Sequence, residues 1–118
     1  MILAACVKIE EKELFVGRTH AAAGLAAVEE MTKRGRDWHR EVKGFLSDSG
    51  DFLSRAKAYI EAKECNQIVR NDFDSESLDS GMLDFTPEQL AQAQQIAKLL
   101  NSKQNETQDC ARLQDMIL

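Results

Sequence analysis

Histidine is the residue that most often supplies acid–base chemistry near neutral pH, and this sequence holds two, His20 and His39. A Ser-His-Asp system needs a nucleophile in contact with a histidine, and neither histidine lies in a recognised nucleophile turn. The sequence therefore predicts a binding protein rather than an enzyme. If the chain were a small hydrolase, His20 would be its one reasonable general base.

Metal and cofactor chemistry find no support in the sequence. The run Asp72-Phe73-Asp74 with Glu76 superficially suggests calcium, but the glycine and the closing glutamate of an EF-hand loop are missing. Neither a GxxxxGK[ST] nor a GxGxxG loop occurs. The three cysteines lie far apart without a CxxC pair, so we expect reduced packing residues. They are Cys6, Cys65 and Cys110. We predict neither a metal nor a cofactor.

Composition and charge restrict the class of partner. The 118 residues, 43% of them hydrophobic, suit a single domain, and the formal charge of -5 disfavours a protein that tracks long nucleic acid. A small anion needs only two or three local arginines. No run of 18 apolar residues exists, and the N-terminal segment lacks the basic flank of a signal peptide. We expect a cytoplasmic protein that does not enter the membrane.

Two places concentrate positive charge in this acidic chain. Gly17-Arg18-Thr19-His20 puts an arginine and a histidine at the start of a predicted helix, where free backbone N–H groups favour an anion. A second group contains Arg34, Arg36, His39, Arg40 and Lys43, with Trp38 among them. The plainer interpretations are a surface arginine beside a helix and a solvated basic edge.

The first half of the chain predicts a small antiparallel sheet with one packed helix. Residues 2–9 and 14–16 read as a β-hairpin with Leu3, Ala5, Val7 and Ile9 on one face, and residues 41–46 as a third strand. Between them, residues 20–34 form an amphipathic helix that ends at Gly35. Its predicted inner face consists of Ala22, Leu25, Val28 and Thr32.

A second helix is predicted over residues 55–65, with Ser54 as its N-cap and Asn66 in the left-handed conformation at its end. Its predicted buried side consists of Ala56, Tyr59, Ile60, Ala62 and Cys65. Residues 70–84 are acidic and lack periodicity, so we expect a loop long enough to suggest a functional role.

The last segment begins with a T-x-x-Q capping box, Thr86 to Gln89, and Phe85 before it can pack on Leu90 or stack on a base. Leu90, Ala93, Ala97 and Leu100 form a helical seam that is diluted over residues 101–106. Either two helices meet there, or one long helix has few apolar residues in its middle. Because one small sheet cannot cover so long a helix, we expect it to pack against another subunit.

The expected architecture is therefore α+β, with a small antiparallel sheet, packed helices and a long C-terminal helix used in oligomerisation. Within this single domain, residues 1–85 would form the ligand-binding core and residues 86–118 the helical oligomerisation segment.

Three motifs in a fixed order resemble a known family. They are Gly17-Arg18-Thr19-His20, the run KGFLSDSGDFLSR over residues 43–55, and AKECNQI over residues 62–68. Together they resemble the G-[RK]-x-H, G-F-[VL]-T-x-x-G-x-F-[VL]-x-R and A-x-x-x-G-Q-[IV] elements of the phage Thoeris anti-defence (Tad-type) proteins. Thr19, Ser47 and Asn66 depart from the histidine, threonine and glycine common at their positions.

The resemblance covers roughly residues 2 to 85 and implies a sponge that sequesters cyclic ADP-ribose signals, and in some members cyclic oligonucleotides of the CBASS system, without cleaving them. It also implies dimers built into hexamers, with ligands held between subunits. Arg18 and His20 would then contact phosphate, Phe85 would stack on a base, and Arg112 would contact phosphate or ribose.

A different class of function also fits the sequence. The acidic loop of residues 71–84 and the helical surface would serve a protein-binding inhibitor or adaptor that acts on a host defence protein. A ligand that co-purifies favours the sponge, and a stoichiometric host protein favours the inhibitor.

Overall fold

The computed structural model describes the backbone of residues 1–37 and 40–117 and the side chains of residues 1–37 and 40–103. The elements follow the order β1 (Ile2–Ile9), β2 (Glu13–Gly17), α1 (His20–Arg34), β3 (Glu41–Ser47), β4 (Phe52–Leu53), α2 (Arg55–Glu64), the 3₁₀ turn η1 (Ser80–Met82) and α3 (Pro87–Ile117). The four strands form one antiparallel sheet in the order β2-β1-β3-β4. The predicted α+β fold with a C-terminal helix is confirmed, and β4 is the strand that the sequence did not indicate.

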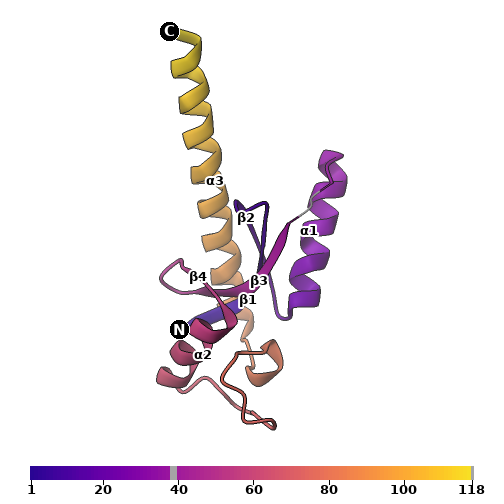
Figure 1. Ribbon diagram of the computed structural model, residues 1–118, viewed down its shortest axis with the longest axis vertical. Coiled ribbons are helices and arrows are strands. Elements are labelled where there is room, and N and C mark those ends of the chain that lie inside the picture. Colours follow the sequence, from indigo (N-terminus) through magenta and orange to yellow (C-terminus); the bar gives the residue numbers. More distant parts are fainter. Residues whose placement is uncertain (38–39, 118) are drawn as a thin grey trace.

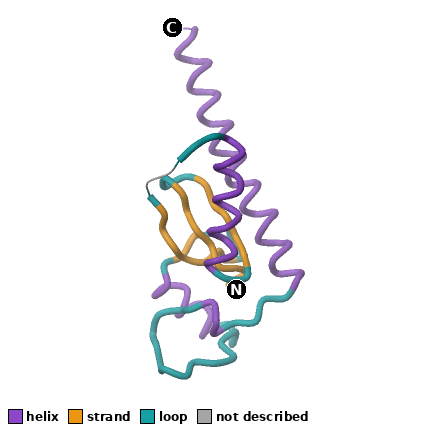
Figure 2. The backbone as a smooth tube through the Cα atoms, turned by 90° about the vertical axis from the view of Figure 1, so that its right-hand side faces the viewer, coloured by secondary structure: helices purple, strands orange, loops and turns teal. Residues whose placement is uncertain are grey.

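Strand β1 lies in the middle of this sheet and is buried on both faces. Helices α1 and α2 cover one face and α3 covers the other (Figure 1, Figure 2). The prediction that Leu3 shares a face with Ala5 is wrong, because the register with β3 shifts between Ile2 and Ala4. This irregularity turns Leu3 toward α3 and Ile2 toward α2.

Helix α1 has the predicted ends but not the predicted inner face. Thr19 accepts a hydrogen bond from the Ala22 N–H, and Gly35 caps the last turn in the left-handed conformation. The residues that pack on the sheet are Ala23, Ala27 and Met31, whereas Leu25 is 60% exposed and Val28 is 44% exposed. The predicted face Ala22, Leu25, Val28 and Thr32 is therefore wrong.

The close approach of Gly17 explains this rotation of α1. A Cβ atom on Gly17 would lie 2.7 Å from the Ala23 nitrogen, so the end of β2 touches the first turn of the helix directly. That contact turns the small side chains of Ala23 and Ala27 toward the sheet and leaves Leu25 on the exposed side. The helix carries two apolar stripes, and a tertiary contact selects between them.

Helix α2 also has its predicted ends. Ser54 accepts from the Lys57 N–H, and Asn66 has a φ of 56°, with Gln67 donating back to the Ala62 carbonyl at 2.8 Å. The buried side is made by Ala58 and Ala62. Three residues placed there by the sequence are exposed, which corrects the prediction: Ala56, Ile60 and Cys65.

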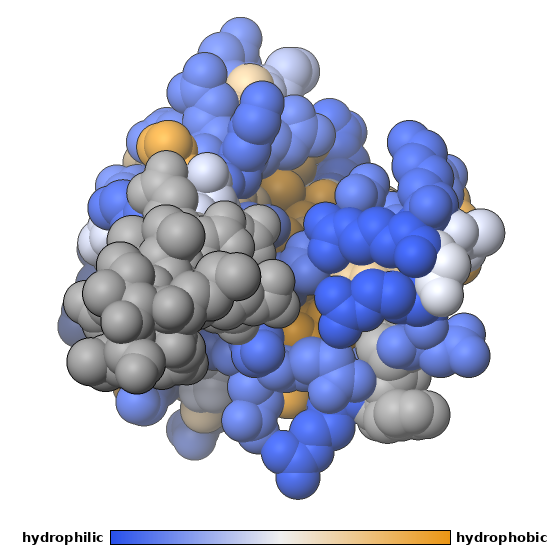
Figure 3. Space-filling view, turned by 90° about the horizontal axis from the view of Figure 1, so that it is seen from above, coloured by the Kyte–Doolittle hydropathy of each residue, from blue (hydrophilic) through white to orange (hydrophobic). Residues whose placement is uncertain are grey.

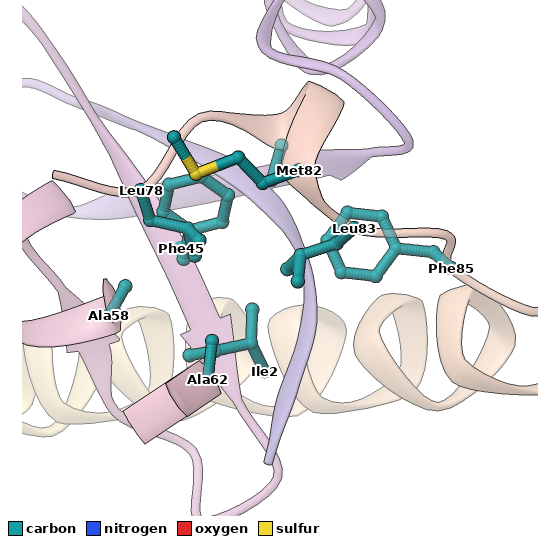
Figure 4. Packing of buried hydrophobic residues seen from close by; sticks show 9 residues of the cluster. Ile2, Phe45, Ala58, Ala62, Leu78, Met82, Leu83 and Phe85 are labelled. Carbon is teal, nitrogen blue, oxygen red and sulfur yellow. The ribbon is translucent and has the colours of Figure 1, made fainter. Parts of the chain in front are cut away.

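Residues 70–84 form a loop, as predicted, but its second half belongs to the core. Figure 4 shows side chains of this segment meeting those of β1, β3 and α2. The cluster consists of Ile2, Ala5, Phe45, Ala58, Ala62, Leu78, Met82, Leu83 and Phe85. Because this loop fills the space beside α2, two alanines suffice on the buried side of that helix.

Helix α3 begins at the predicted capping box and runs as one continuous helix. Gln89 N–H donates to the Thr86 hydroxyl, and Thr86 N–H donates to the Gln89 side chain. Ala93 and Ala97 are buried, and Leu90 and Leu100 pack beside them. At about 1.5 Å per residue the helix is about 46 Å long, and it runs on past the sheet (Figure 1).

Two further points concern α3 and the other helices. The seam expected after residue 106, with Cys110, Leu113, Met116 and Ile117, lies outside the described side chains. Within the described part of the chain, no helix is both long enough and apolar enough to cross a membrane.

Strand β2 is an edge strand, and α3 pairs with its free backbone. The side-chain amide of Asn101 accepts from the Leu14 N–H at 2.9 Å and donates to the Leu14 carbonyl at 3.0 Å. A single side chain thus takes the place of a neighbouring strand at this position.

We expect Asn101→Ala to lower the free energy of unfolding by about 1–2 kcal/mol, because two partly buried backbone groups lose their partner. Urea denaturation measures this as a lower midpoint at unchanged slope. The exposed neighbour Ser102 provides the control, since Ser102→Ala leaves the midpoint unchanged. Equal midpoints for both variants would show that water replaces the amide without cost.

Candidate functional site

Two of the three motifs that stand apart in the sequence meet around the His20 side chain. The Nε2 atom of His20 lies 2.7 Å from the Gly44 carbonyl oxygen, and its Nδ1 atom lies 3.3 Å from an Nη atom of Arg55. His20 opens α1, Gly44 lies in the middle of β3 and Arg55 opens α2. Residues separated by up to 35 positions thus form one hydrogen-bonded group.

The partners of His20 determine its protonation. A carbonyl oxygen only accepts, so Nε2 carries the proton and donates to Gly44. In the neutral ring Nδ1 is then the acceptor, and Arg55 donates to it. The half-buried ring also packs edge-on against Phe45, with the ring centroids 4.9 Å apart. Both nitrogens of His20 are therefore engaged within the protein.

Arg55 connects this group to the loop of residues 70–84. One Nη atom donates to the Leu78 carbonyl at 3.1 Å while the other faces His20, and the Leu78 N–H donates back to the Arg55 carbonyl at 2.9 Å. A guanidinium carries five N–H donors, and these contacts use two of them. The partly exposed side chain therefore keeps donors for an anion.

The electrostatic surroundings of His20 are positive. Its pKa lies below the ordinary value of 6.5, first because burial disfavours the charged ring and then because the Arg55 and Lys43 cations repel a proton. The Gly44 hydrogen bond and the Asp79 carboxylate oppose this shift only in part. The lowered pKa therefore favours the neutral ring, which can accept the hydrogen bond that Arg55 donates.

The glycine of the second motif, Gly44, is required for steric reasons. A Cβ atom on Gly44 would lie 2.4 Å from the Leu53 carbonyl oxygen and 2.6 Å from the Phe52 ring. Its absence lets β4 close onto β3, which brings Arg55, two residues after β4, within reach of His20. The motif therefore encodes the geometry that holds Arg55.

The residues expected to bind a ligand are placed differently from one another. Arg18 is exposed beside the N-terminus of α1, two positions before His20 in the sequence. It has no hydrogen-bond or ion-pair partner among the described residues. Phe85 is 5% exposed within the core cluster, where its ring cannot stack on a ligand bound at the surface. The side chain of Arg112 lies outside the described residues.

Arg55 did not stand among the expected ligand residues, although the sequence held a signal for it. It is the final residue of the second motif and directly follows the N-cap Ser54. The first turn of a helix disfavours a cation, so an arginine there indicates a specific partner. His20 is that partner.

The basic stretch of residues 34–43 is partly neutralised. Arg34 lies 2.6 Å from Glu13 and 3.1 Å from Glu30, and Arg40 lies 2.6 Å from Glu11. Trp38 and His39 lie outside the described residues. Of this stretch, Lys43 is the cation whose charge acts on the His20 ring.

A groove of about 560 Å³ runs along β2 between α1 and α3. Figure 3, which looks down on this end of the molecule, shows apolar surface between polar rims. Its walls contain Glu13 and Glu30, which already bind Arg34, together with Lys98. Because these carboxylates would repel phosphate, the group around His20 is the better candidate for binding an anion.

Two cysteines lie within the described residues, and neither forms a disulfide. Cys6 is buried in β1, and burial raises the pKa of its thiol to about 12. Cys65 is exposed, against the expectation that it packs inward. No cluster of three metal-ligating side chains occurs among the described residues.

Comparison with known proteins links the chain to phages. Residues 1–84 match the family model described as Phage T4 y16D protein. This range includes all three motifs and every residue of the group around His20. No curated protein matches the chain, and no solved structure does.

We expect the folded protein to lose stability as the pH falls below about 6.5. With its pKa lowered in the folded state, neutral His20 stabilises the fold above 6.5, and this contribution is lost as the unfolded chain takes up the proton. The loss ends once the pH passes the lowered folded-state pKa. Urea denaturation between pH 7.5 and about 5 measures it.

His20→Gln serves as the comparison because it removes this titration and retains His39. The free energy of unfolding of the wild type falls more steeply than that of the variant across this range. Parallel profiles would mean that His20 titrates alike in the folded and unfolded chain.

Proposed function

The chain belongs to the phage T4 y16D protein family, and on that premise we propose that this phage protein binds and sequesters a cyclic nucleotide immune signal without cleaving it. The ligand class is cyclic ADP-ribose isomers, with cyclic oligonucleotides as a second group. The resemblance of its motifs to Tad-type proteins supports this class.

The observation that carries the proposal is the pair of cations beside His20, Arg55 in contact with the ring and Lys43 close enough to act on it. Arg55 and Lys43 both act on the ring, and Arg18 is exposed at the adjoining start of α1. In a chain with a formal charge of -5, this concentration calls for an anionic partner. The N-terminus of α1 adds the positive end of a helix dipole beside Arg18.

The same group argues for binding without cleavage. His20 is neutral and its two nitrogens are engaged by Gly44 and Arg55, so the ring is not poised to take a proton from water. The hydroxyls that precede His20 and Arg55, on Thr19 and Ser54, both accept hydrogen bonds as helix caps. In this arrangement His20 positions Arg55 rather than acting as a base.

The strength of binding follows from the number of charged contacts. A hydrogen bond to a charged group contributes about 1.5–3 kcal/mol, and a buried pair with phosphate lies toward the upper end. Contacts from Arg18, Arg55 and Lys43 together would therefore support tight binding of a diphosphate.

Oligomerisation belongs to the proposal as well. The group around His20 lies at the surface of one chain, whereas tight binding of a nucleotide requires walls on several sides. Helix α3 continues past the sheet, so its last turns have no sheet of their own chain to pack on (Figure 1). A homo-oligomer, first a dimer and then a hexamer, would pair these helices and supply the second wall, with Arg112 on the paired segment.

Calorimetric titration with cyclic ADP-ribose isomers and cyclic dinucleotides tests the proposal. We expect saturable binding of at least one of them, and heating then releases the ligand unchanged. A cleaved product would make the protein an enzyme, and a flat response to the whole panel would contradict the sponge.

We expect Arg18→Ala and Arg55→Lys to weaken this binding at least about tenfold, which corresponds to the loss of one charged contact. The melting temperature separates the two variants. Arg18→Ala leaves it nearly unchanged because the side chain is exposed, whereas Arg55→Lys lowers it because lysine cannot reach Leu78 and His20 together.

Arg36→Ala is the matched control, since it removes an equal charge from an exposed position. Equal weakening by Arg36→Ala would mean that net charge alone governs affinity. A melting temperature lowered by Arg18→Ala would assign Arg18 a structural role.

A further inference from the structure

The loop of residues 70–84 lies beside α2 at one end of the molecule (Figure 2), and three large apolar side chains are exposed on these segments and the stretch that joins them. Phe73 is 94% exposed, and Ile60 and Val69 are 57% and 56% exposed. The same loop buries Leu78, Met82 and Leu83 in the core. The loop thus buries three of its apolar side chains but leaves the aromatic ring of Phe73 exposed to water.

Hydrogen bonds within the loop close the backbone turn that contains Phe73. The Asn71 side chain donates to the Ser75 carbonyl and accepts from the Ser75 N–H, both at 2.9 Å, which closes the turn around Phe73. The ends of the loop are tied to the rest of the fold, since Val69 N–H donates to Met82 and Leu78 N–H donates to Arg55. A backbone held in this way loses little conformational freedom when a partner binds the turn.

Two hollows are lined in part by residues of the loop. One of about 140 Å³ is lined by residues that include Phe73, Asp79 and Met82. Another of about 490 Å³ lies on α2, where Tyr59 and Ile60 form its apolar part and Glu76 of the loop borders it. An exposed aromatic ring beside hollows of mixed apolar and polar lining resembles the surface found at protein–protein interfaces.

The charge of this end is negative. Its exposed acidic side chains are Glu64, Asp72, Asp74, Glu76 and Asp79. The nearby Arg70 is bound to Asp84, which leaves Lys63 as the exposed cation beside the hollow on α2. This surface repels phosphate groups, and it also repels the same acidic surface on a second copy of the chain.

We propose that the turn around Phe73, with the two hollows beside it, docks onto a protein that offers an apolar pocket within a basic surface. The ring enters the pocket as the anchor, and the carboxylates around it meet the basic rim. This docking surface is independent of the group around His20, so the protein holds its anionic ligand and a protein partner at separate places.

Site-specific photo-cross-linking in the bacterial host tests the proposal. A photoreactive benzoylphenylalanine replaces Phe73 in the full-length chain, and the same residue replaces Leu25, which is 60% exposed on α1, as the control. We expect one abundant adduct from position 73, absent from position 25, that contains a host or phage protein with a basic surface.

The cross-linked protein is then purified and titrated with variants. We expect Phe73→Ala to weaken the complex at least about tenfold, as for a central anchor, and the double variant Asp72→Asn/Asp74→Asn to weaken it less and to flatten its salt dependence. Leu25→Ala leaves affinity unchanged. Because Phe73 is exposed, Phe73→Ala also leaves the melting temperature unchanged, which separates lost docking from misfolding.

Three results would overturn the proposal. They are the absence of any adduct, an adduct that forms equally from both positions, and an adduct between two copies of this chain. A complex that Phe73→Ala does not weaken would equally exclude Phe73 as the anchor.

Discussion

The fold depends on the burial of β1 on both faces. A strand in the middle of a four-stranded sheet must be covered from two sides, and three helices do this with small side chains close to the strand. Ala23 and Ala27 of α1 lie on one face, and Ala93 and Ala97 of α3 lie on the other. Such small contacts keep the helices near the sheet, so the loops between them come close to one another at its edges.

The group around His20 is a consequence of this close packing. Gly17 lets α1 begin against the end of β2, and Gly44 lets β4 close on β3, so the first residues of α1 and α2 face each other. His20 and Arg55 then complete each other's hydrogen bonds. An arginine at the start of a helix is unfavourable by itself, and here the neutral imidazole and the Leu78 carbonyl stabilise it.

Charge divides the surface into regions with different partners. Cations gather where α1 and α2 begin, whereas the loop of residues 70–84 is acidic and exposes Phe73. Arg55 belongs to both regions, since it bonds His20 on one side and Leu78 of the loop on the other. Arg55 therefore lies between the two proposed surfaces.

Local interactions made the helix ends, the strands of the first hairpin and the third strand predictable from the sequence. Thr19, Gly35, Asn66 and the capping box at Thr86 each act within a few residues, so the sequence by itself determined where α1 and α2 begin and end and where α3 begins. The sequence also determined the order of the motifs that contain His20 and Arg55.

Only the tertiary structure decided which stripe of α1 and of α2 is buried, because these two helices carry apolar residues on more than one side and distant contacts choose among them. The same holds for the shift in β1 that turns Leu3 away from Ala5, for β4, and for the contact of His20 with Arg55. Each arises between residues far apart in the chain, where spacing along the sequence holds no information about distance in space.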